Sequence, residues 1–257
     1  LKMKSSDGKR ADRYGLVKYV SHYFFINQRR KITGAFLAII VLFVWITNGY
    51  LQDEPLIVSF QSIYSSSDFL LISCLILPFI FIISNLYQVY DKNVLLIRCL
   101  NLRSWYNQKI LTGLYVLPVY LFFVNFPFLV SLIVHHLTGS VTFDFIGFWL
   151  LSILFQGMGF LIIGLLYLFI QSFTGRNVIS SVLTCLILTI PSLIRGLFYV
   201  KVNSFPDYMF LSNLERNSSI ESIILQFIVF VITGGLLQSL NLSIVEKKDI
   251  LWREQGR

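Results

Sequence analysis

Residues whose chemistry would serve catalysis or metal binding are few in this chain. His135 and His136 are adjacent, so on a helix they point to different faces, and no third ligand stands near them in the sequence. The chain has no His-Glu-x-x-His zinc motif, no Gly-x-Ser-x-Gly nucleophile turn and no Walker A loop. We therefore expect no catalytic site, no metal and no cofactor of its own, and any ATP-driven work must draw on another polypeptide.

Charged side chains inside apolar segments are the other candidates, because each costs about 2.5–3.5 kcal/mol at the centre of a membrane helix. Arg195 is the one such residue that we place within an apolar segment, near its outer end. It is either a pathway or gating contact for a substrate, or a side chain that reaches the interface or pairs with Asp207 or Glu215. No carboxylate lies deep in an apolar segment, which argues against a proton- or sodium-coupled carrier.

Six long apolar stretches must position any site that the chain has. Each comes close to or exceeds the roughly 20 residues that a helix needs to cross a bilayer core. The mean hydropathy of +0.72 and the 13% of charged residues are wrong for a soluble globular chain. The sequence predicts an all-α membrane protein with a single transmembrane domain over residues 1–257. The six predicted spans are residues 33–51, 69–87, 110–137, 145–170, 178–199 and 220–244.

The basic residues indicate how these spans are oriented. If the N-terminus is cytoplasmic, eighteen of the twenty-one Lys and Arg lie in inner segments, and the outer loops carry only Lys201 and Arg216. This is the positive-inside distribution. It predicts that both termini are cytoplasmic, and it explains the net charge of +8 as a topology signal without nucleic acid as a partner.

Two inner segments carry amphipathic patterns. Residues 12–30 place apolar side chains at helical spacing beside basic ones, which predicts an interfacial helix on the membrane lipids; the alternative is a basic flank that only fixes topology. Residues 88–109 contain no Pro or Gly and alternate apolar with basic residues. They predict a short cytoplasmic helix that docks on a partner, or else one that rests on the membrane surface.

In this second segment the chain resembles the membrane subunit of an ABC-2-type transporter, the permease family of type-2 exporters. The resemblance covers nearly the whole length, with a basic interfacial helix, six spans and a long inner segment after the second span. Its pattern is an acidic residue, a Leu-rich turn, Arg residues and a Lys that opens the third span. Two departures are the missing Gly-Thr after the acidic residue and Asn101-Leu102 where a Pro is frequent. The matching residues are Asp91, Leu95, Leu96, Arg98, Arg103 and Lys109.

The resemblance implies an assembly in a bacterial plasma membrane. Two permease subunits, identical or related, would form the pathway, and a dimer of cytoplasmic ABC ATPase subunits would bind the ATP below them. The short cytoplasmic helix of residues 88–109 would be the coupling helix, which docks on the ATPases through Asp91, Leu95, Leu96, Arg98 and Arg103. The apolar spans suit a hydrophobic or amphipathic cargo: a peptide, as in antimicrobial peptide export or immunity, or else a lipid or a drug.

Three further features leave alternatives open. A non-transporting accessory or sensor protein would use the same inner segment to recruit a partner, whereas an intramembrane enzyme lacks its catalytic residues. Gly157 and Gly164 lie on one helix face and allow close packing, either between subunits or within one. In the outer connection of residues 200–219, Tyr208, Phe210 and Leu211 fit either a short re-entrant helix or an aromatic belt at the outer surface.

Overall fold

The computed structural model describes five stretches of the chain: residues 72–91, 102–134, 142–198, 203–211 and 220–255. Before them it describes only Ile26, Thr33, Gly34, Leu37, Ile57, Val58, Phe60 and Gln61. Within these residues the chain is all-helical and has no strand, and five helices are long and apolar enough to cross a membrane. Most of the first predicted span (33–51) and of the interfacial helix (12–30) lies outside the described residues.

The helices follow one another in a simple order. The π-helical turn η1 (Ile72–Ile76) runs directly into α5 (Leu77–Tyr90), where Pro78 cannot donate a backbone hydrogen bond to the preceding turn. The later helices are α7 (Leu102–Val134), α8 (Phe143–Thr174), α9 (Asn177–Phe198), the short α10 (Phe205–Met209) and α11 (Ile220–Gln255).

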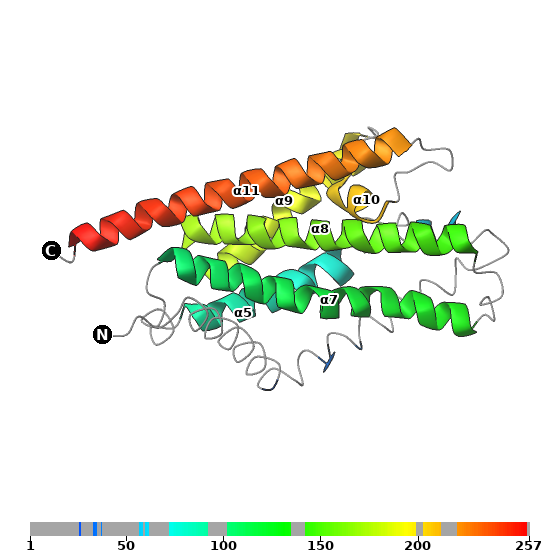
Figure 1. The fold of residues 1–257 in the computed structure, drawn as a ribbon, viewed down its shortest axis with the longest axis horizontal. Helices are drawn as coiled ribbons and strands as arrows, with labels where there is room; N and C mark the ends of the chain where they lie inside the picture. Colours follow the sequence, from blue (N-terminus) through cyan, green and yellow to red (C-terminus); the bar gives the residue numbers. More distant parts are fainter. Residues whose placement is uncertain are drawn as a thin grey trace, which may run out of the picture.

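Helix α8 is the centre of the bundle, and α5, α7, α9, α10 and α11 all pack on it. Helices α7, α8 and α11 run side by side along the long axis of the molecule (Figure 1). The limits of α8 are encoded locally. Thr142 accepts a hydrogen bond from the Phe145 N–H at the first turn, and Gly175, in the left-handed region with φ 64°, ends the last turn.

Two helices extend beyond the predicted spans, and both extensions lie at the same end of the bundle. Helix α7 begins at Leu102 and not at residue 110, and α11 continues to Gln255 beyond the predicted end at residue 244. Segment 88–109 is therefore not one separate coupling helix, because its first residues finish α5 and its last ones form the start of α7. Hydropathy locates the apolar centre of a helix, whereas backbone hydrogen bonding carries the helix on into its polar flanks.

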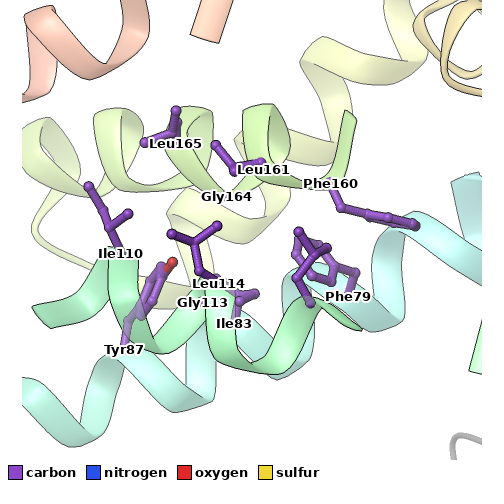
Figure 2. Close-up of a pocket in the computed structure, with 11 residues that line it drawn as sticks. Phe79, Ile83, Tyr87, Ile110, Gly113, Leu114, Phe160, Leu161, Gly164 and Leu165 are labelled. Carbon is purple, nitrogen blue, oxygen red and sulfur yellow. The ribbon is translucent and has the colours of Figure 1, made fainter. Parts of the chain in front are cut away.

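The core between α5, α7 and α8 contains a cluster of aromatic rings. Phe79, Tyr120 and Phe160 are buried and lie with ring centroids 4.7–5.1 Å apart. Figure 2 shows the adjacent crevice, where side chains of α5, α7 and α8 converge. Its volume of about 20 Å³ is close to the roughly 10–15 Å³ that one water requires, and its lining is mainly apolar, so it is a packing defect and not a ligand site.

Gly157 and Gly164 face helices of the same chain. A Cβ at Gly157 would lie 3.4 Å from Leu121 Cδ1 of α7, and one at Gly164 would lie 3.8 Å from the Tyr87 hydroxyl of α5. This arrangement matches the second of the two predicted uses, close packing within one subunit.

The outer connection contains a short buried helix. Phe210 and Leu211 are fully buried, Tyr208 is 36% exposed, and Met209 packs directly against Gly159 of α8. Phe210 and Leu211 therefore do not form an aromatic belt at the surface, and the described part of this connection is the short helix α10.

Helices α9 and α11 are only partly covered by the rest of the bundle. Only 17% of the most apolar stretch of α9 and 11% of that of α11 is buried, although both stretches are rich in Leu, Ile and Val. In water such faces would be unstable, whereas lipid tails or another apolar helix can cover them. The described residues thus form a helical architecture typical of a multi-pass membrane protein.

Candidate functional site

The most concentrated polar chemistry lies where α5 ends and α7 begins. Asp91 caps α5, Lys109 stands two turns into α7, and Gln171 lies in the last turn of α8. The Lys109 ammonium donates to Asp91 Oδ1 at 2.6 Å, and Gln171 Nε2 donates to Asp91 Oδ2 at 3.0 Å. One carboxylate therefore joins three helices.

Lys109 is fully buried, whereas the Asp91 side chain is 31% exposed. Removing an ammonium from water costs several kcal/mol unless new interactions replace its hydration. Asp91 supplies the opposite charge, and the Trp105 ring centroid lies 3.9 Å from Nζ, within cation–π range. The Trp105 indole in turn donates to the Tyr90 carbonyl at 3.0 Å, so the end of α5 and the start of α7 are joined twice.

The same network continues into α9. Gln171 Nε2 also donates to Asn177 Oδ1 at 2.6 Å, and the Tyr167 hydroxyl donates to Ser84 at 3.1 Å. Asn177 is the first residue of α9, and Ser84 lies on α5. Side-chain hydrogen bonds therefore connect α5, α7, α8 and α9 at one end of the bundle.

The predicted docking residues separate into three groups. Asp91 faces inward, toward Lys109 and Gln171. Arg103 lies at the start of α7 and pairs with Glu246 of α11 at 3.4 Å, with both side chains more than half exposed. The remaining three, Leu95, Leu96 and Arg98, lie outside the described residues. Docking by all five residues stays a prediction.

Sequence reasoning did not predict that Lys109 is buried. The charge pattern assigns it to an inner loop, yet it is a buried member of a helix. The signal that would have found it is local: Trp105 precedes it by one helical turn, and an acidic residue ends the preceding span. A lysine so placed has both an aromatic face and a carboxylate within reach.

Arg195 pairs with Asp207 at the opposite end of the bundle. Its Nη2 lies 2.6 Å from Asp207 Oδ2, and the same carboxylate accepts from the Ser204 backbone N–H at 2.7 Å. Ser204 and Asp207 form the capping box of α10. The pairing is one of the two predicted interpretations of Arg195, and it connects α9 to α10; a pathway or gating role stays a prediction.

A second polar cluster, within the spans, was not predicted. Asn125 Nδ2 of α7 donates to Gln156 Oε1 of α8 at 2.8 Å, and its Oδ1 accepts from the Trp149 indole at 3.2 Å. Gln156 donates in turn to Ser152 at 3.1 Å. Amides in an otherwise apolar span were the available signal, because such side chains need partners in lipid.

A cavity of about 220 Å³ adjoins the Asp91 network. It lies between α7, α8 and α11, and Asp91, Trp105, Tyr106, Gln171, Asn241 and Val245 are among its lining residues. It is larger than the crevice in Figure 2, and it has both apolar and polar walls. It is therefore a place where the described residues could hold a ligand.

Metal ligands were the other candidates in the described part of the chain. No group of three or more His, Cys, Asp or Glu residues there is arranged to hold a metal ion, while His135 and His136 lie outside it.

Compared with known proteins, the chain matches no family model, no curated protein and no solved structure.

Proposed function

We propose that this chain is the permease subunit of an ATP-driven ABC exporter in a bacterial plasma membrane. Two permease subunits would form the pathway, a dimer of separate cytoplasmic subunits would bind and hydrolyse ATP, and the cargo would be a hydrophobic or amphipathic peptide. The resemblance of residues 91–109 to the ABC-2 permeases motivates this assignment. The multi-pass helical architecture is compatible with it.

The observation that carries the proposal is the double connection at the base of segment 92–101. The Asp91–Lys109 ion pair and the hydrogen bond from Trp105 to the Tyr90 carbonyl join the two helix ends that flank this segment. In the proposed mechanism, a partner that pushes on the segment displaces α5 and α7 together. A flexible connection would instead absorb the displacement without moving the spans.

The same displacement has a route to the other helices. Gln171 on α8 holds Asp91 and Asn177, so α8 and the start of α9 are joined to the moving pair by hydrogen bonds of 3.0 and 2.6 Å. This connected end of the bundle supports a mechanism in which ATP-driven closure of the ATPases reorients several spans at once. The mechanism requires that this hydrogen-bond network can adopt two discrete arrangements.

Charge supports the orientation in which this end is cytoplasmic. The described residues near it include Arg103, Arg176 and Lys247, whereas Asp144 and Glu221 lie at the opposite end, at the starts of α8 and α11. Under the positive-inside rule the basic end faces the cytoplasm, where an ATPase would be available.

The first test is affinity purification of the tagged chain in mild detergent, followed by mass spectrometry. We expect a stoichiometric cytoplasmic ATPase with a Walker A motif. A folded membrane protein that brings no ATPase would contradict the proposal and favour an accessory or sensor protein. If the ATPase is present, stimulation of its activity by peptides, lipids or drugs will distinguish the three classes of cargo.

The second test addresses the docking segment. The double charge reversal R98E/R103E should abolish co-purification of the ATPase without preventing membrane insertion, because it replaces two basic contacts by repulsive charges. The matched control is K201E/R216E, which reverses the two basic residues of the predicted outer loops. Unchanged co-purification with R98E/R103E, or equal loss with the control, would contradict the docking assignment.

A further inference from the structure

The cavity between α7, α8 and α11 is large enough for a small organic molecule. Its volume is about 220 Å³, whereas a single water requires roughly 10–15 Å³. The apolar crevice in Figure 2, at about 20 Å³, is an internal comparison for ordinary imperfect packing. The larger volume, beside a buried ion pair, leaves room for an occupant.

One part of the cavity wall is apolar and aromatic. Trp105 and Tyr106 come from α7, Leu168 from α8 and Val245 from α11. Ligand sites typically combine such a lining with a small number of polar groups that fix orientation. This wall fits an aromatic or branched aliphatic body.

The polar part of the wall offers several hydrogen-bond acceptors. Its two hydroxyl groups already donate elsewhere, that of Tyr106 to Gln238 Oε1 at 3.2 Å and that of Ser172 to the Phe169 carbonyl at 2.6 Å. Gln171 spends its amide N–H groups on Asp91 and Asn177, and Asn241 donates its amide to the Leu165 carbonyl at 3.0 Å. Each of these amides also has a carbonyl oxygen that can accept a hydrogen bond. The Asp91 carboxylate, 31% exposed, can also accept more than the two bonds described above.

The chemistry of the ligand follows from this imbalance. Acceptors attract a hydroxyl, amide or amine and repel a carboxylate. Because Lys109 already balances the charge of Asp91 at 2.6 Å, the ligand does not have to be a cation. We propose that this cavity binds a small amphipathic molecule with an apolar body and a polar end that donates hydrogen bonds.

The proposal has a consequence for transport. If the chain is an exporter permease, the cavity is where the polar end of the cargo is recognised at the inner side, next to the carboxylate that joins α5, α7 and α8. This consequence rests on the proposed function. Binding itself does not, so it is tested on the isolated chain without an ATPase.

The probe is 2-(4-fluorophenyl)ethanol, observed by fluorine NMR with the purified full chain in detergent. We expect saturable broadening of its signal. Two matched probes examine the polar end: 1-ethyl-4-fluorobenzene lacks the donor, and 4-fluorophenylacetate replaces it by a carboxylate. Loss of a hydrogen bond to a charged acceptor predicts binding weaker by about tenfold or more for both. Equal affinity for all three would overturn the proposed donor recognition.

Variants that fill the cavity distinguish it from the detergent micelle. Ser172 and Ile244 line the cavity, so Ser172→Trp and, independently, Ile244→Trp should remove the saturable broadening. Leu186→Trp is the matched control, because Leu186 lies on α9 and is 51% exposed. Each variant is first checked for monodisperse elution. If a well-folded cavity variant retains the broadening of the unmodified protein, the cavity is not the binding site.

Discussion

The sharpest prediction concerns the Asp91–Lys109 pair, whose two members are not equivalent. Asp91→Asn leaves the fully buried Lys109 ammonium without an opposite charge, whereas Lys109→Met leaves Asp91, a carboxylate that is 31% exposed and still bonded to Gln171. Burial thus predicts that the aspartate substitution is the more damaging of the two, although both remove the same ion pair.

The magnitude follows from the environment of the ammonium. Breaking a buried ion pair from one side costs about 3–5 kcal/mol. The amide introduced by Asp91→Asn retains a weaker acceptor, and the Trp105 ring remains 3.9 Å from Nζ, so we expect the lower end, about 3 kcal/mol. For Lys109→Met we expect the free energy of unfolding to fall by about 1 kcal/mol, because a partly solvated carboxylate loses one hydrogen-bond donor. The double variant D91N/K109M should resemble Lys109→Met.

The difference in stability between the variants is measured by thermal unfolding of the purified chain in detergent, with size-exclusion chromatography as the readout. At about 2–4 °C per kcal/mol, Asp91→Asn should lower the midpoint by roughly 6–12 °C. The matched control is Arg103→Met, which removes a cation from the same helix but from an exposed pair with Glu246, and should cost only about 0–1 kcal/mol. If Lys109→Met is as damaging as Asp91→Asn, the unequal burial of the two charges does not govern stability.

Two further substitutions test the packing of α8. A Cβ at Gly159 would lie 2.5 Å from Met209 Cγ, so Gly159→Ala should displace α10 and lower the free energy of unfolding by about 1–3 kcal/mol. Adding Met209→Ala in the same chain should recover part of this loss. An unchanged midpoint of thermal unfolding for Gly159→Ala would contradict this contact. Asn125→Leu removes the partner of both Gln156 and Trp149 and should cost about 1–2 kcal/mol in the same assay. A more stable Asn125→Leu variant would show that the amide cluster is not needed for the contact between α7 and α8.

The sequence by itself determined the class of this protein. Uncharged apolar segments long enough to cross a bilayer must become helices, because only internal hydrogen bonds satisfy a backbone in lipid. Five such helices are present in the described residues, at the predicted second to sixth spans. The charge pattern also named Asp207 as a candidate partner for Arg195, whereas Asp91 was singled out by the resemblance to the ABC-2 permeases.

The tertiary structure decided which polar residues act together. Asp91, Lys109 and Gln171 lie far apart in the sequence, and their meeting depends on how three helix ends are placed around the Asp91 carboxylate. Hydropathy measures the preference of each segment for lipid and contains no term for contacts between segments. The burial of Lys109 therefore became evident only from the tertiary structure, in which α7 starts at Leu102 and carries Lys109 inside the bundle. The cavity beside it likewise exists only because of how α7, α8 and α11 are placed around it, which no single segment of sequence specifies.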